Sequence, residues 1–113
     1  MKPLVSVIVP IYNAAPFLRE TLDSIVASTY RPIEVVMVDD GSHDDSLKIA
    51  QSYCELHAEC QVIAQDNRGV SAARNTAIKA AKGTYILPVD ADDKIADTLI
   101  EKAVEVIEHD NNI

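Results

Sequence analysis

Two aspartates, Asp90 and Asp92, stand one residue apart directly after an apolar run of the chain. Carboxylates crowded in this way repel one another unless a cation or a hydrogen-bonding ligand is present. Their oxygen atoms are donors of the type that Mg²⁺ and Mn²⁺ prefer, whereas Ca²⁺ normally demands a fuller cage of ligands. The pair therefore predicts a divalent-metal site, and a phosphate ligand that shares the ion would complete it.

Similar polar turns follow other apolar runs, and Asp40 stands in one of them. Ligands of open parallel sheets bind beyond the carboxyl ends of the strands, so a site is expected at these turns. We expect Asp40 to belong to the same site as Asp90 and Asp92. Other polar residues near the turns are interpreted as turn and helix-capping residues, namely Asp44, Asp45, Ser46 and Asp97.

Several other kinds of chemistry have no signature in this sequence. It contains neither a glycine-rich dinucleotide fingerprint nor a P-loop, so a phosphorylated ligand would be held through the metal. No Ser/His/Asp or Cys/His arrangement has a plausible spacing for a nucleophile. The net charge of −8, from 10 basic and 18 acidic residues, argues against nucleic acid and an acidic membrane surface as partners. No apolar run approaches the ~20 residues of a membrane-spanning helix, and we expect a cytoplasmic protein.

The elements that must position these turns alternate between strands and helices. Residues 4–9 and 33–38 are nearly continuous in apolar side chains, which predicts strands buried on both faces of a parallel sheet. Shorter strands are expected at 61–64 and 84–89, the latter at an edge or a local break because Pro88 cannot donate to a ladder.

Helical spacing of apolar residues predicts a helix after Pro16, helices over about 46–57 and 70–82, and a last helix that begins near Thr98. We expect Val70, Ala73, Ala77, Ile78 and Ala81 to face inward and Gly83 to cap its helix in a left-handed conformation. The alternation predicts an α/β fold, a doubly wound parallel sheet with right-handed crossovers. A chain of 113 residues suffices for one domain and not for two.

Four motifs occur in an order that carries a family resemblance. They are Val5-Ser6-Val7-Ile8-Val9-Pro10-Ile11-Tyr12-Asn13, Val38-Asp39-Asp40-Gly41-Ser42, Asn67-Arg68-Gly69 followed by Ala73-Arg74-Asn75, and Lys82-Gly83 followed by Asp90-Ala91-Asp92-Asp93. With them the sequence resembles glycosyltransferase family 2 over essentially its whole length. The resemblance implies an incomplete three-layer, Rossmann-like GT-A fold with strand order 3-2-1-4. It also implies an inverting enzyme that transfers a sugar from a nucleotide diphosphate donor, most often UDP-linked, to an acceptor hydroxyl.

The resemblance assigns six residues to the nucleotide, five of them outside the Asp90-Ala91-Asp92-Asp93 motif. Pro10 and Tyr12 are similar to the wall of the family's nucleobase pocket, and Asp40 to the carboxylate that recognises the base. Gly69 either lets the backbone approach the nucleotide closely or simply starts a helix. Arg74 either contacts the donor or pairs with a neighbouring aspartate.

The resemblance also gives the aspartates after the fourth strand their roles. Asp92 is similar to the carboxylate that meets an Mn²⁺ or Mg²⁺ ion bridging the diphosphate, and Asp90 to one near the ribose or a metal-bound water. Asp93 is expected to contact the donor sugar. In the family the metal neutralises charge on the departing diphosphate while a carboxylate takes a proton from the acceptor hydroxyl.

That catalytic base lies downstream of the aspartate motif in the family, so we expect no catalytic residue within 1–113. We interpret 1–113 as a single domain, the nucleotide-sugar-binding part of a longer transferase that is inactive by itself. A saccharide or lipid-linked acceptor, as in polysaccharide biosynthesis, and any membrane association would belong to the remainder. Because the family adds strands beyond the fourth, we expect the open edge of the sheet to mediate self-association.

Two other functions are weighed against this interpretation. A receiver domain of signalling proteins has a similar length and an acidic Mg²⁺ pocket, but it needs its acidic pair after the first strand and a lysine after a fifth. Here the acidic pairs follow the second and fourth strands. A nucleotide-binding module without catalytic parts fits this chain as well as a truncated enzyme does.

Overall fold

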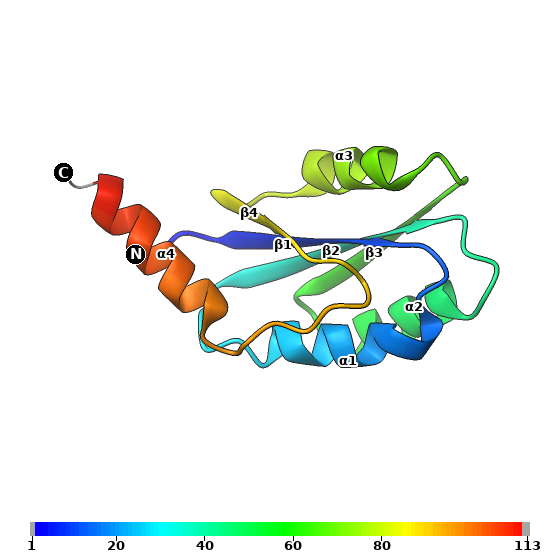
Figure 1. The fold of residues 1–113 in the computed structure, drawn as a ribbon, viewed down its shortest axis with the longest axis horizontal. Helices are drawn as coiled ribbons and strands as arrows, with labels where there is room; N and C mark the ends of the chain where they lie inside the picture. Colours follow the sequence, from blue (N-terminus) through cyan, green and yellow to red (C-terminus); the bar gives the residue numbers. More distant parts are fainter. Residues whose placement is uncertain (1, 112–113) are drawn as a thin grey trace.

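The computed structural model describes residues 2–111 and contains one parallel sheet. Its strands are β1 (Val5–Ile11), β2 (Ile33–Asp40), β3 (Cys60–Gln65) and β4 (Tyr85–Pro88), in the order β3-β2-β1-β4 (Figure 1). Every residue of β1 is buried, and so is every residue of β2 except Glu34, because both faces of these central strands are covered. The predicted fold class and strand order are confirmed. The receiver-type order 2-1-3-4-5 is excluded.

Helices flank both faces of the sheet. They are α1 (Ala15–Val26), α2 (Ser46–Leu56), α3 (Val70–Ala80) and α4 (Leu99–Asn111). Helices α1 and α2 cover one face, α3 covers the other, and α4 lies toward the amino ends of the strands (Figure 1). Within residues 2–111 no helix has both the length and the apolar composition needed to cross a bilayer. The expected cytoplasmic location stays a prediction.

Helix α3 packs on the sheet through two of the small side chains that its sequence pattern predicts. Its contacts with the sheet are made by Ala73 and Ala77, which are fully buried. Val70 and Ile78, expected to face inward, are 52% and 44% exposed, so that expectation is wrong. Two alanines bring the helix axis near the strands, and Val70, in the first turn, borders the cavity described below instead.

Gly83 does not have the left-handed conformation that the sequence predicts. Among the described glycines, positive φ occurs at Gly41 and Gly69, and α3 ends at Ala80 with Ala81 extended. Glycine is needed at position 83 because a side chain does not fit there: a Cβ would lie 2.4 Å from the hydroxyl oxygen of Ser6. The Gly83 N–H donates to that same hydroxyl at 2.8 Å, which joins the start of β4 to β1.

The strand that contains Pro88, β4, lies at an edge of the sheet, as the sequence predicts. Residues 89–98 then return along α1 (Figure 1). The Thr21 hydroxyl donates to the carbonyl of Ala91 at 2.8 Å, and the N–H of Ile95 donates to Ser24 Oγ at 3.1 Å. Farther along, Thr29 N–H donates to the carbonyl of Asp97 at 2.8 Å. These bonds fix the segment after β4 beside the second half of α1 and the residues that follow it.

Candidate functional site

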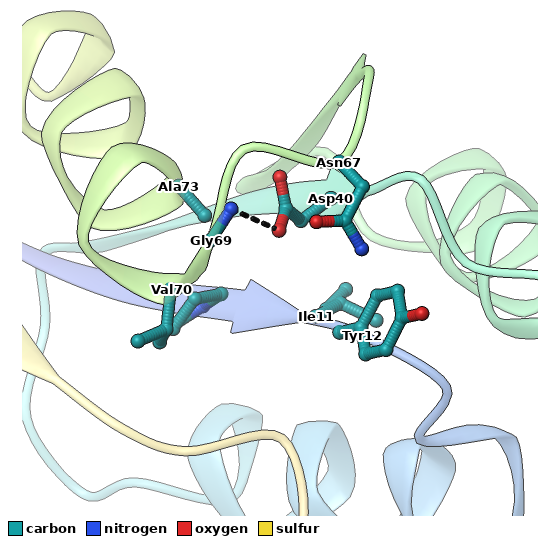
Figure 2. A pocket seen from close by; sticks show the side chains of 8 residues that line it. Ile11, Tyr12, Asp40, Asn67, Gly69, Val70 and Ala73 are labelled. Carbon is teal, nitrogen blue, oxygen red and sulfur yellow. Dashed lines mark hydrogen bonds between the residues drawn. The ribbon is translucent and has the colours of Figure 1, made fainter.

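A first hollow lies at the carboxyl ends of β1 and β2, where the sequence predicts a site. It has a volume of about 250 Å³ and is lined by Pro10, Ile11, Tyr12, Asp40, Asn67, Gly69, Val70 and Ala73. Figure 2 shows Asp40 and Asn67 on one side of it and Tyr12 and Val70 on the other. Ligand cavities usually measure ~300–1,000 Å³, so this hollow suits one flat ring system better than a whole nucleotide. Its walls are apolar, and the Asp40 and Asn67 side chains supply polar groups.

Asp40 ends β2 and is 3% exposed, yet its charge is satisfied within the protein. One carboxylate oxygen, Oδ1, accepts from Arg68 N–H at 2.9 Å and from Gln65 Nε2 at 3.0 Å, and Oδ2 accepts from Gly69 N–H at 2.9 Å. Burial raises the pKa of this carboxyl, but these hydrogen bonds and the charge of Arg68 lower it on balance. Asp40 therefore anchors the loop before α3.

The two glycines with positive φ shape this loop. Gly69, at φ 100°, is the N-cap of α3, and a Cβ there would meet nothing within 4 Å, so the backbone conformation alone demands glycine. Gly41, at φ 72°, follows Asp40, and a Cβ there would lie 2.8 Å from the backbone nitrogen of Asn67. The turn after β2 and the loop after β3 thus touch, and this contact holds Asn67 at the rim of the hollow.

A second hollow of about 260 Å³ adjoins the first. It is lined by Pro10, Tyr12, Asn13, Ala14, Phe17, Val70, Asp90, Ala91 and Asp92. The two hollows share Pro10, Tyr12 and Val70. A ligand with a flat ring at one end and negative groups at the other could therefore lie across this shared wall toward the aspartates.

The acidic cluster consists of Asp90, Asp92 and Asp93. One carboxylate oxygen of each lies within 4.8 Å of the others, and all three residues are exposed. The Asp93 N–H donates to the Asp90 carbonyl at 3.0 Å, which closes the turn that brings them together. Such oxygen donors, with room for water or phosphate at the remaining positions, fit Mg²⁺ or Mn²⁺. Asp40 is not part of this cluster, and its carboxylate lies at the first hollow instead.

Arg74 lies on α3 and reaches toward the cluster without neutralising it. Its Nη2 is 3.4 Å from Asp90 Oδ1, and both side chains are largely exposed. Exposed pairs of this kind contribute at most about 1 kcal/mol. The pairing with a neighbouring aspartate is confirmed, and the contact of Arg74 with a nucleotide stays a prediction.

A network of side chains holds the loop that carries Tyr12. Asp44, before α2, accepts the N–H of Ala15 at 3.1 Å through Oδ2, and its Oδ1 accepts the hydroxyl of Ser46 at 2.6 Å. Ser46 Oγ in turn accepts the N–H of Ala14 at 2.9 Å. Burial raises the pKa of Asp44, and its hydrogen bonds lower it on balance. Asp44 Oδ1 also accepts the N–H of Ser46, the first residue of α2, at 2.9 Å, so the turn and capping role predicted for Asp44 is confirmed at the starts of both α1 and α2. Ser46 bonds the residue before α1 instead of capping α2, and Asp45, the N-cap of α2, makes no side-chain cap hydrogen bond.

The structure thus brings Pro10, Tyr12, Asp40 and Gly69 together at the first hollow. It places Asp90 and Asp92 at the second, with Asp93 and Arg74 beside them. Sequence reasoning missed four residues that line the first hollow, Ile11, Asn67, Val70 and Ala73, and four more that line the second, Asn13, Ala14, Phe17 and Ala91. Asn67 had a usable signal, since it stands beside Arg68-Gly69 in a turn after a strand. The roles assigned to the individual residues remain predictions.

Comparisons with known proteins agree with this geometry. The family model described as Glycosyl transferase family 2 matches residues 6–113. A Bacillus subtilis protein named uncharacterized glycosyltransferase EpsJ is 47% identical over 108 residues, which is 96% of this chain and 31% of that protein.

Two solved structures resemble the chain along 96% of its length. The S. aureus TarS 1–349 complex with UDP-GlcNAc has a TM-score of 0.86 at 34% identity, and 32% of its chain is covered. Mannosyltransferase PcManGT from Pyrobaculum calidifontis, in complex with GDP-Man and Mn²⁺, has a TM-score of 0.82 at 32% identity, with 32% covered. The chain spans about a third of the length of each of these proteins.

Proposed function

The chain belongs to glycosyltransferase family 2, and from this premise we propose that its two adjoining hollows bind a nucleotide diphosphate sugar, with a UDP-sugar as the expected donor. The base would occupy the first hollow, between Tyr12 and the loop held by Asp40. Asn67 carries both an amide donor and an acceptor at the rim, which suits the edge of a base. The diphosphate would extend across the shared wall to Asp90 and Asp92.

The acidic cluster would hold a divalent ion at the diphosphate. Asp92 and Asp90 are the proposed metal ligands, with Asp93 toward the donor sugar. When bound, the ion would neutralise charge that develops on the departing diphosphate. That PcManGT is found with GDP-Man and Mn²⁺ supports a metal here, and the choice between Mn²⁺ and Mg²⁺ is part of the test below.

We assign donor and metal binding to this chain and no catalytic base. The proposed reaction is inverting transfer of the sugar to the hydroxyl of a saccharide or lipid-linked acceptor. The acceptor site and the base would then belong to a longer polypeptide, and the coverage of about a third of the relatives supports this division. The alternative, a nucleotide-binding module that never had catalytic parts, predicts the same donor binding.

The observation that carries the proposal is the wall shared by the two hollows, which places an apolar ring site beside three clustered carboxylates. Titration calorimetry with UDP alone, with UDP and Mn²⁺, and with UDP and Mg²⁺ tests it. We expect the metal to tighten UDP binding about tenfold or more, equivalent to about 1.4 kcal/mol, because the ion would offset the repulsion between the diphosphate and the acidic cluster. Asp92→Asn should remove this gain, and Asp97→Asn, an exposed aspartate outside the cluster, should keep it. UDP binding that is indifferent to both metal and Asp92→Asn would contradict the site.

We also propose self-association through the outer edge of β4. This strand lies at the edge of the sheet, and Ile86 within it is 41% exposed, which favours pairing with another strand, although Pro88 limits the length available. Sedimentation equilibrium over increasing protein concentration should show a monomer–dimer equilibrium. A strict monomer at high concentration would contradict this proposal and leave donor binding unaffected.

A further inference from the structure

The chain has one phenylalanine, Phe17, and the core does not use it. Helix α1 buries Leu18, Leu22 and Ile25 completely, whereas Phe17, in its first turn, is 50% exposed. Neighbouring positions on a helix point about 100° apart, so Phe17 lies beside the buried stripe and not within it. Exposing a large aromatic ring to water is unfavourable, and a ligand that covers the ring would remove this cost.

Phe17 lines the second hollow together with Tyr12, Asp90 and Asp92. The hollow therefore combines carboxylates with an aromatic ring that takes no part in lining the first hollow. Sites for small polar ligands commonly pair apolar and aromatic walls with a few convergent polar groups. This composition suits a ligand with both negative groups and an apolar face.

Hydrogen bonds fix Phe17 relative to the aspartates. The hydroxyl of Thr21, one turn along α1, lies 3.2 Å from the carbonyl of Phe17 and donates at 2.8 Å to the carbonyl of Ala91, between the two aspartates. Ser24, another turn-spacing along the helix, accepts the N–H of Ile95 at 3.1 Å. The ring of Phe17 and the carboxylates thus stand on elements that are joined through a buried contact.

We propose that Phe17 is the platform for the pyranose ring of the donor sugar, an inference that rests on the proposed function. A diphosphate held by a metal at Asp92 places the group bonded to its outer phosphate in the second hollow, which Phe17 also lines. The C–H face of a pyranose is apolar and weakly positive, and it complements the negative face of an aromatic ring. UDP ends at the phosphate and leaves this platform uncovered.

A single phenylalanine permits a direct test by fluorine NMR. Incorporation of 4-fluorophenylalanine into the 113-residue chain gives one protein ¹⁹F resonance, which reports on Phe17 alone. With Mg²⁺ present, UDP-glucose or UDP-N-acetylglucosamine should shift this resonance well beyond the shift that UDP causes. Sugar nucleotides that bind by calorimetry but move the resonance no more than UDP does would overturn the inference. A shift caused by a free methyl glycoside, and not by sugar nucleotides, would assign the platform to the acceptor and overturn it as well.

Substitutions separate a sugar contact from a structural role. Phe17→Leu should leave UDP affinity within about twofold and weaken the sugar nucleotide about fivefold, the size of an aromatic contact of roughly 1 kcal/mol. Phe17→Tyr should restore the affinity, and Val106→Ala, at a 61% exposed apolar position on α4, is the matched control. Equal weakening of UDP and UDP-sugar in Phe17→Leu would overturn the platform. Failure of every nucleotide to bind the unaltered chain would overturn the proposed function itself.

Discussion

The two hollows satisfy their carboxylates in opposite ways. In the first, Asp40 is buried and receives its hydrogen bonds from Gln65, Arg68 and Gly69, all within the protein. In the second, Asp90, Asp92 and Asp93 are exposed and crowded, and the nearest cation among the described contacts is Arg74 at 3.4 Å. The fold itself satisfies the carboxylate of the first hollow, whereas the carboxylates of the second remain accessible to a ligand. The proposed binding of a base and the proposed binding of a metal diphosphate therefore place different demands on the same small sheet.

The largest effect on stability should come from Asp40, in the first hollow. Asp40→Asn replaces an acceptor of three hydrogen bonds by an amide with one acceptor oxygen, which leaves partly buried N–H donors without a partner. We expect a loss of about 3 kcal/mol in the free energy of unfolding, measured by urea denaturation. The control Asp97→Asn should stay within about 0.5 kcal/mol of the unaltered chain. A loss under 1 kcal/mol for Asp40→Asn would show that the loop does not depend on this carboxylate.

Acid should lower the stability that the buried carboxylate of the first hollow contributes. The folded-state pKa of Asp40 lies below its ordinary value, and so does that of Asp44. Groups of this kind contribute stability above the unfolded pKa, about 3.9, and lose it as the pH falls through the folded pKa. The free energy of unfolding should therefore decline below about pH 4, and the decline should be shallower in Asp40→Asn. Identical acid profiles for the two proteins would contradict the assignment of this pKa shift to Asp40.

A matched pair of threonines can separate the two hollows. Thr21 ties α1 to Ala91 beside the second hollow, and the Thr76 hydroxyl donates to Gln65 Oε1 at 2.7 Å behind the first. Thr21→Val and Thr76→Val should each cost about 1 kcal/mol of stability, as one hydrogen bond usually does. We expect Thr21→Val to reduce the gain that Mn²⁺ gives to UDP binding, and Thr76→Val to weaken metal-free UDP binding. If both variants changed the same quantity, the hollows would act as one unit.

Physical reasons were sufficient to predict the central sheet and the end of it where the hollows lie, whereas Pro10, Tyr12 and Gly69 were singled out by the family resemblance. Continuous apolar runs identify strands buried on both faces, and turn residues after such strands fall at one end of a parallel sheet. The failures share a different cause. Gly83 is needed because it packs on Ser6, far away in the chain, and Val70 is exposed because it begins its helix beside the hollow. Local spacing carries no information on either contact.

The smallest effect on stability is expected at Asp92, in the acidic cluster of the second hollow. If the carboxylates of the acidic cluster repel one another without a metal, Asp92→Asn removes a repulsion and no hydrogen bond. The free energy of unfolding should then stay equal or rise by at most about 0.5 kcal/mol. Added NaCl should also stabilise the unaltered chain more than the variant, because salt screens repulsion between exposed charges. A destabilisation of about 1 kcal/mol or more would mean that Asp92 has partners within the protein, and the contrast with Asp40 would be lost.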